Sequence, residues 1–521
     1  MSIRRIAHRA LALAGLLTAV TGCSDGTPRP APAPALLLSR VSVSVVPGGN
    51  ELVSVVPLDG GGGYAPYQAT SSDPGVATAV VSGNGLTITG VGLGTSSITI
   101  SGTGGVSRTL PVQVYDHHEI DTGELVITYA DTFEHIVDLP VVVYNDAELL
   151  LHDEVVGASA WRPLPPAGFH ALGSFMVAPN ANPSGNRAVM VVKARPGSNA
   201  LAFTQTYDEV YTIAWSRGAR GAKFWRPVCP TGYQAMGMVA TFGVTPGWPH
   251  TTPCVRQDLT IGAAAGGTAI HTTSGQEVLS WWKVDLANVG PHSGLYLAPG
   301  TFVLATGTAA PAFDPAIHVL NVRLPMLGEA PIQDFSPSLT GYLEPDAETP
   351  PRFAKAMLVP CTMVNDVVGK DVPWRIANSP FYRLERHVFY KRLFHDYNKT
   401  SLVQPHQVVM TSGVTTAETN TFRESTNISI SAEVGIELMD VVSAKVTATA
   451  SHEFGYETQT SISELQQREV TTPIHTAPGK AAALWQQYNR YVLYRHEGTA
   501  LTPVTAWQFG IESYVTDEYP H

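Results

Sequence analysis

The sequence predicts an all-β protein made of several antiparallel units, and three observations support this prediction. Only 14% of the 521 residues are charged, against roughly 25% in typical soluble domains. The 47 glycines and 39 prolines supply the turns that many short strands require. Apolar and polar residues alternate along several segments, and Asn84-Gly85 lies between two of them, which predicts a β-hairpin.

The length is sufficient for about three domains, and 44% hydrophobic residues can form their cores. The formal net charge of −11, with no basic run after the N-terminus, argues against nucleic acid as a partner. The sequence contains no P-loop, no G-x-S-x-G motif and no H-E-x-x-H motif. We therefore expect a protein that is not an enzyme and that uses no cofactor or metal ion.

Residues 1–22 have the features of a signal peptide, with early arginines followed by a short apolar run from Ala10 to Val20. The run Val20-Thr21-Gly22-Cys23 resembles the lipobox of bacterial lipoproteins. That resemblance implies cleavage before Cys23, lipidation of this cysteine and, with Ser24 next, an outer-membrane location. An ordinary secretory signal is the alternative. We expect an exported outer-membrane or cell-surface protein, and the sequence leaves open whether the anchor is shed.

Two segments follow the expected anchor. Residues 23–36 are rich in proline and alanine and predict a semi-rigid tether. Residues 37–115 predict a small β-sandwich. Within it, SSDPGVATAVVSGNGLTITGVGLGTSSITISG (Ser71 to Gly102) resembles the bacterial Ig-like domain of the intimin and invasin type. Such modules serve as spacers or adhesive stalks, so the resemblance implies no catalytic residue.

An internal repeat occupies residues 116–330. WRPLPPAGFHALG begins at Trp161 and matches WRPVCPTGYQAMG, which begins at Trp225; a weaker third copy begins at Trp281-Trp282. A three-fold repeat of short strands predicts a β-prism, in which three sheets share one core. We expect Trp161, Trp225 and Trp282 to be core residues at equivalent positions. A role as ligand platforms is the alternative.

The phrase FWRPVCPTGYQAMGMV, followed by CVRQDL, resembles the family named for vacuolar protein sorting-associated protein 62. It is also similar to β-prism modules of membrane-trafficking proteins. The resemblance implies a module that recognises a cell-surface glycan or a lipid headgroup. Cys229 and Cys254 lie in one repeat and can form a disulfide; the alternative is that these two and Cys361 are three buried thiols.

Residues 331–350 predict a linker, and residues 351–521 predict a third unit with two matched amphipathic stripes at 426–454. The apolar positions of both stripes are Ile428, Ile430, Ala432, Val434, Ile436, Leu438, Val442, Ala444, Val446, Ala448 and Ala450. The polar positions between them include Ser429, Ser431, Glu433, Glu437, Lys445, Thr447 and Thr449.

The two apolar stripes share one face only if a three-residue loop, Met439-Asp440-Val441, joins two strands. The resulting pairs are Leu438 with Val442, Ile436 with Ala444, Val434 with Val446, Ala432 with Ala448 and Ile430 with Ala450. Each strand then has the ~9–11 residues that a tilted strand needs to cross a membrane. We expect the Ser/Thr-rich residues on both sides to extend the two arms.

An amphipathic hairpin with polar arms resembles the aerolysin and epsilon-toxin type of β-pore-forming protein. The resemblance implies an elongated antiparallel sheet domain that stores the hairpin on the monomer and releases it into a homo-oligomeric ring. The apolar positions would then face lipid and the polar positions the lumen. A closed ring is required because open strand edges leave backbone groups unsatisfied in lipid.

Two functions stay open from the sequence. One is an exported, lipid-anchored protein that binds a membrane lipid or a cell-surface glycan and forms an oligomeric β-barrel pore. The other is a surface adhesin, or a glycan- or headgroup-binding lipoprotein, without a pore, because any half-buried antiparallel sheet also alternates. The pore hypothesis requires residues 426–454 to form two adjacent antiparallel strands in the folded protein.

Overall fold

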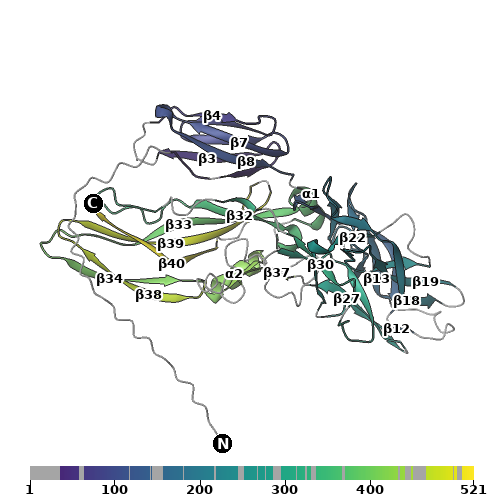
Figure 1. Ribbon diagram of the computed structural model, residues 1–521. Helices are drawn as coiled ribbons and strands as arrows, with labels where there is room; N and C mark the ends of the chain where they lie inside the picture. Colours follow the sequence, from purple (N-terminus) through teal and green to yellow (C-terminus); the bar gives the residue numbers. More distant parts are fainter. Residues whose placement is uncertain are drawn as a thin grey trace, which may run out of the picture.

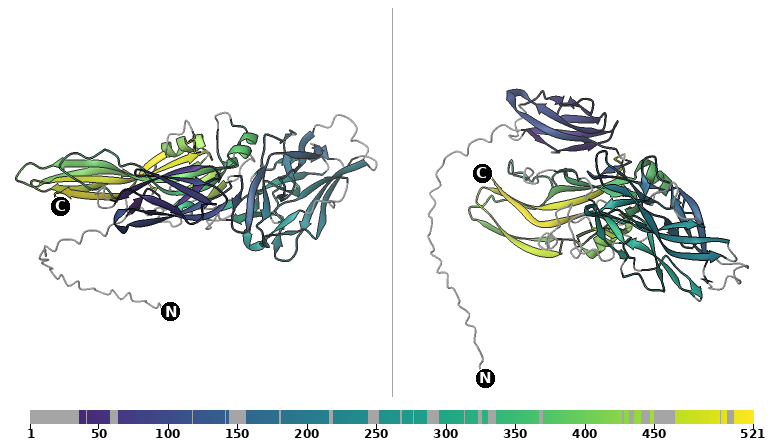
Figure 2. Two further views of the ribbon diagram at one scale, coloured as in Figure 1. Left: turned by 90° about the horizontal axis from the view of Figure 1, so that it is seen from above. Right: turned by 45° about the vertical axis from the view of Figure 1, so that its right-hand side comes forward.

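The computed structural model describes residues 36–521, apart from 41, 58–63, 117, 141, 144–155, 180, 216–218, 244–251, 267, 276, 286–294, 313, 323–325, 330–335, 367–369, 427, 432–434, 440–446, 450–464, 497 and 502–506. Strands dominate, in mainly antiparallel sheets, and the all-β prediction is confirmed. Figures 1 and 2 show an elongated molecule. A small sandwich lies alongside a unit of long strands, and a unit of repeated short strands occupies one end.

The first unit is a sandwich of two four-stranded sheets. One sheet has the order β1 (Leu36–Leu38), β3 (Asn50–Pro57), β6 (Gly85–Gly90), β5 (Ala77–Ser82). The other has the order β2 (Val43–Val45), β8 (Ser107–Val114), β7 (Gly94–Ser101), β4 (Gln68–Ser71). The expected hairpin is present: Ser82 pairs with Gly85, so Gly83 and Asn84 form its turn, with φ +60° at Gly83. The likeness to bacterial Ig-like domains stays a prediction.

The second unit repeats one pattern of six strands three times. In each repeat the first, fourth and sixth strands form one sheet, and the second, third and fifth form another. The first repeat consists of β10 (Leu125–Ala130), β11 (Phe133–Pro140), β13 (Val156–Pro163), β14 (His170–Ala171), β15 (Phe175–Val177) and β16 (Val189–Ala194). The second consists of β17 (Leu201–Phe203), β18 (Thr206–Trp215), β19 (Ala219–Val228), β20 (Tyr233–Gln234), β21 (Val239–Phe242) and β22 (Pro253–Arg256). The third consists of β23 (Thr260–Gly262), β24 (Ala264–Ala265), β27 (Leu279–Asp285), β28 (Leu295–Leu297), β29 (Phe302–Thr306) and β30 (His318–Val322).

The third unit contains the longest strands of the molecule. Its main sheet has the order β31 (Met326–Glu329), β32 (Arg352–Pro360), β33 (Phe381–Tyr397), β39 (Ala481–Tyr494), β40 (Trp507–Tyr519). A separate pair, β34 (Gln404–Ser412) and β38 (Arg468–Thr476), packs its apolar side chains against β39. The helices are α1 (Val372–Asn378) and α2 (Thr416–Thr426), and three short strands, β35 (Ile428–Ser431), β36 (Gly435–Met439) and β37 (Thr447–Thr449), form a small sheet.

The three units are in contact with one another. One hydrophobic core runs from the repeat unit into the third unit and includes Leu279, Phe302 and Tyr382. Charged groups of the sandwich contact the third unit: Glu51 accepts from Arg383 of β33 at 3.0 Å, and the Arg40 guanidinium lies 4.7 Å from the ring centroid of Phe353 in β32. β37 lies against β28 of the repeat unit, so the small sheet lies at the junction of the two larger units (Figure 1).

Candidate functional site: the segment between β34 and β38

The paired strands β34 and β38 enclose a long inserted segment, residues 413–467. Nine residue pairs join the strands, from Gln404 with Thr476 to Ser412 with Arg468, and the two residue numbers of every pair add up to 880. Odd-numbered residues of both strands are exposed, whereas even-numbered ones such as Val408 are buried or half-buried, except Arg468. The ladder therefore has one buried face, formed by even positions.

Gly413 is the residue at which the chain leaves this ladder. Its φ is +87°, a left-handed conformation that residues with a Cβ rarely adopt. Its N–H donates to the carbonyl oxygen of Gly510 in β40 at 2.8 Å. A Cβ at this position would lie 2.1 Å from the carbonyl oxygen of Gln466. Both the backbone angle and the close approach therefore require glycine.

Helix α2 follows Gly413 and is attached to the main sheet through an aromatic contact. The sequence TAETNTFREST is polar, and Phe422 is its one large buried side chain among the described residues. The Phe422 ring stacks on Trp507 of β40, with ring centroids 5.7 Å apart. Trp507 in turn packs against Phe509 and Tyr491. Phe422 thus anchors the helix to the main sheet.

The end of α2 is fixed by hydrogen bonds. Asn365 donates from its backbone N–H to the carbonyl of Thr426 at 3.0 Å and from its side-chain amide to the carbonyl of Glu424 at 3.1 Å. The Thr426 hydroxyl donates to the carbonyl of Phe422 at 2.6 Å and accepts from the N–H of Ile428 at 3.1 Å. Thr426 and Ile428 are fully buried. These bonds satisfy backbone groups that a helix end leaves without intrahelical partners.

A buried ion pair lies next to Asn365. Asp366 accepts two hydrogen bonds from the Arg495 guanidinium, at 2.7 and 2.8 Å, and one from the Tyr382 hydroxyl at 2.8 Å. Burial alone would raise the pKa of Asp366, but the hydrogen bonds from Arg495 and Tyr382 hold it below the usual value. Arg375 of α1 donates to the Asp366 carbonyl at 2.9 Å. The pair therefore fixes the loop that holds α2.

The predicted hairpin at 426–454 is wrong for this conformation, because three short strands take the place of two long ones. Leu438 pairs with Ile428 and Ala448 instead of Val442, and Ile430 pairs with Ile436 instead of Ala450. Among the polar positions, Ser429 pairs with Glu437, Ser431 with Gly435, Thr449 with Glu437 and Thr447 with Met439. The other residues of the predicted pairs, Ala432, Glu433, Val434, Val442, Ala444, Lys445, Val446 and Ala450, lie outside the described residues.

The physical reason is that the alternation of apolar and polar residues fixes parity, that is, whether odd- or even-numbered positions share a face. It does not fix where the turns lie. Leu438 meets Ile428 on one side and Ala448 on the other, so even positions still pair with even positions. The three-stranded arrangement is shorter and fits against the protein, with Ile428 in the common core. The Ser/Thr-rich residues before it also differ from the prediction: they form helix α2 and not a strand.

The repeat tryptophans occupy equivalent positions in the repeat unit. Trp161, Trp225 and Trp282 lie on the third strand of their repeats and are buried. Each indole N–H donates to a hydroxyl: that of Trp161 to Ser159 at 2.7 Å, that of Trp225 to Thr241 at 2.9 Å and that of Trp282 to Ser280 at 2.8 Å. Their burial and satisfied indoles fit core residues and leave little ring surface for a ligand.

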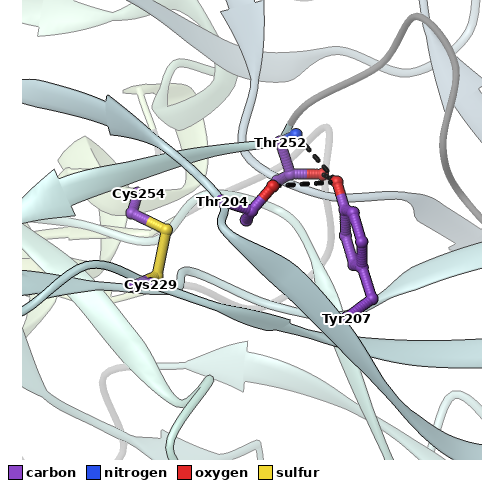
Figure 3. Close-up of a disulfide and its surroundings, with 5 residues drawn as sticks. All are labelled: Thr204, Tyr207, Cys229, Thr252 and Cys254. Carbon is purple, nitrogen blue, oxygen red and sulfur yellow. Dashed lines mark hydrogen bonds between the residues drawn. A yellow bond between two sulfur atoms is a disulfide. The ribbon is translucent and has the colours of Figure 1, made fainter.

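Cys229 and Cys254 form a disulfide (Figure 3). Cys361 is buried and lies outside this disulfide. The bridge ties the end of β19 to β22. Nearby, the Tyr207 hydroxyl donates to the Thr252 hydroxyl at 3.1 Å and accepts from the Thr252 N–H at 2.9 Å. These contacts hold β18 against β22. Sequence alone had left open whether the two cysteines were bridged. Cys23 lies outside the described residues.

Two properties of the described part of the chain bear on membranes and metal ions. No helix there combines the length and the apolar character that crossing a membrane requires. No three His, Cys, Asp or Glu side chains among the described residues lie close enough together to bind a metal ion.

Two family models match separate parts of the chain. Residues 104–329 match the model described as vacuolar protein sorting-associated protein 62, as the repeat motif predicted. Residues 353–515, which contain β34, β38 and the inserted segment, match the model described as insecticidal crystal toxin, P42. This match supports the predicted toxin-like character of the third unit. The matching family differs from the aerolysin and epsilon-toxin type that the amphipathic hairpin resembles. No curated protein matches the chain.

Solved structures give distant similarities. GNIP1Aa from Chromobacterium piscinae is 16% identical over 36% of this chain and 34% of its own, with a TM-score of 0.27, so the chain spans about a third of that protein's length. Cry35Ab1 is 13% identical over 62% of this chain and 89% of its own, also with a TM-score of 0.27. Domains 5-6 of the S-layer protein SbsC are 14% identical over 41% of this chain and all of theirs, with a TM-score of 0.15.

Proposed function

We propose that this protein is a membrane-damaging, toxin-like protein. In this proposal the repeat unit binds a membrane lipid or a cell-surface glycan. The folded protein does not meet the requirement of two adjacent strands over 426–454. In this proposal the inserted segment must therefore leave the body and refold into the hairpin, which adds two strands per molecule to a ring-shaped β-barrel. The toxin-family match over 353–515 supports a toxin-like role for the unit that carries the segment.

The observation that carries the proposal is a coincidence of register. If the β34–β38 ladder continued through the inserted segment, paired residue numbers would still add up to 880. Leu438 would then pair with Val442, Ile436 with Ala444 and Ile430 with Ala450. This is the register that the amphipathic pattern predicts without reference to β34 or β38. The existing ladder can therefore act as the base of the predicted hairpin with no slip.

The faces agree as well. Even positions of β34 and β38 form the buried side of the ladder, and even positions of 428–438 and 442–450 are the apolar ones. Because side chains alternate with a period of two, a one-residue slip would place these stripes on the opposite face. In the continued hairpin the apolar positions of the tip would lie on the same side as the buried positions of the ladder. Between the two, even positions such as Thr416, Glu418 and Glu424 would place polar residues on this side.

The pore requires several copies, since one hairpin has two unpaired edges. We therefore propose a homo-oligomer on the membrane. We further propose that the protein is exported and anchored through Cys23, that it is not an enzyme, and that nucleic acid is not a partner. The stored form found here shelters Phe422, Ile428 and Leu465 in the common core. These contacts must be exchanged for lipid or for neighbouring copies in the ring.

Dye release from liposomes tests the proposal, with and without limited proteolysis of the protein. We expect release by the purified mature chain, an SDS-resistant oligomer, and loss of both with Val434→Glu. Val409→Glu is the matched control, because Val409 is exposed on the odd-numbered face of β34 and would not face lipid. If intact protein binds glycans or vesicles but never releases dye, the protein is an adhesin and the pore is ruled out.

A further inference from the structure

We infer that Gly413 is the hinge that stores the inserted segment, and that its release restores the unbroken β34–β38 register. Because a hinge matters only for a segment that leaves the body, the inference rests on the proposed function. It adds which residue controls the change and which contacts must break.

The first evidence is a one-residue shift at Gly413. The two residue numbers of every β34–β38 pair add up to 880. In an antiparallel ladder, backbone hydrogen bonds join residues whose numbers have this same sum. The next bond, from the Val414 N–H to the Leu465 carbonyl at 3.0 Å, joins residues whose numbers add up to 879. The chain is therefore out of register by one residue directly after Gly413. That shift turns the strand away from the ladder and into α2.

The second evidence is that the stored form needs glycine and the extended form does not. With φ +87°, Gly413 is held where a Cβ would meet the Gln466 carbonyl oxygen and the Gln467 nitrogen, at 2.1 and 2.6 Å. In the continued ladder Gly413 would pair with Gln467 in an ordinary strand conformation, which other residues adopt freely. A side chain at this position therefore penalises the stored form alone.

The third evidence is a set of contacts among the described residues that hold the stored form in place. Gly413 donates to Gly510, Phe422 stacks on Trp507, and Asn365 donates twice to the end of α2. Asn365 lies outside the inserted segment and can be changed without altering the proposed hairpin. The hinge and the Asn365 contacts thus act together on the same stored form.

The test compares Gly413→Ala with Gly479→Ala in the full-length protein. Gly479 also has a positive φ, +74°, but it lies in the turn between β38 and β39, and a Cβ there would meet nothing within 4 Å. Both substitutions place alanine in the left-handed region, yet the Gly479 turn is common to the stored and extended forms. We expect Gly413→Ala to release calcein from phosphatidylcholine–phosphatidylglycerol vesicles about tenfold faster than wild type. Gly479→Ala should release it at the wild-type rate.

Asn365→Ala is the second variant, in case Gly413→Ala does not fold. It should also speed release, because the side-chain hydrogen bond to the Glu424 carbonyl is lost, whereas the backbone bond to Thr426 is kept. Equal or slower release by both variants overturns the hinge. If no protein releases dye, the proposed function fails, and hydrogen exchange then decides on the hinge alone. Faster exchange of residues 414–428 in Gly413→Ala than in Gly479→Ala supports it, and equal exchange overturns it.

Discussion

Removal of the Phe422 ring tests whether the inserted segment is a separable unit. Phe422 is 2% exposed and stacks on Trp507. A buried Phe→Ala change costs ~3–5 kcal/mol. The rest of α2 is polar, so Phe422 provides most of the helix's apolar attachment. We therefore expect Phe422→Ala to free α2 locally and to leave the main sheet folded.

Hydrogen exchange measured by peptide mass spectrometry gives the readout. Since each 1.4 kcal/mol is about a tenfold change, residues 416–426 should exchange at least about 100-fold faster, up to their limit when unfolded. Strands β33 and β39 should change little. Phe509→Ala is the matched control. The buried Phe509 ring contacts the same Trp507, with ring centroids 4.7 Å apart, but it belongs to strand β40 of the main sheet. Its loss should therefore speed exchange of β39 and β40.

The result that would refute this reasoning is a uniform effect. If Phe422→Ala raises exchange in β33 and β39 as much as in α2, the segment is part of the cooperative core. It could not then leave while the body stays folded. The proposed rearrangement would lose its physical basis, whatever the register of β34 and β38.

The remaining predictions concern stability and the two other units. Asp366→Asn should lower the free energy of unfolding by ~3–5 kcal/mol, because the buried guanidinium of Arg495 loses its charged partner; denaturant melts measure this. The pKa of Asp366 is lowered in the folded state, so its carboxylate stabilises the fold above about pH 4, and this contribution is lost as the pH falls further. On acidification the free energy of unfolding of wild type should therefore fall more than that of Asp366→Asn. Trp225→Phe should cost about 1 kcal/mol from the lost indole hydrogen bond without changing glycan or vesicle binding; a large loss of binding at unchanged stability would instead make this ring a ligand contact. Cys229→Ser paired with Cys254→Ser should cost roughly 3 kcal/mol, because the bridge closes a loop of 25 residues, and reductant should then leave the melting temperature of the double variant unchanged.

The sequence by itself determined features that depend on neighbouring residues. Alternation with a period of two set which positions of 428–438 and 442–452 share a face, and this parity persists in the three short strands. Two copies of the Trp-Arg-Pro motif and a weaker third copy predicted the three-fold unit, since similar sequences form similar strand patterns. The hairpin near Asn84-Gly85 followed from local turn chemistry.

Tertiary structure alone decided where the ladder stops and what the inserted segment becomes. Thr416–Thr426 has weak intrinsic helix propensity, and it is helical because Phe422 packs on Trp507 and Asn365 binds the helix end. Neither partner is near α2 in the sequence, so no local pattern could indicate them. The same holds for Gly413, whose left-handed conformation depends on the approach of Gln466 from the opposite strand. Parity is a local property of a strand, whereas turn position is set by whatever the two ends of the segment touch in the folded protein.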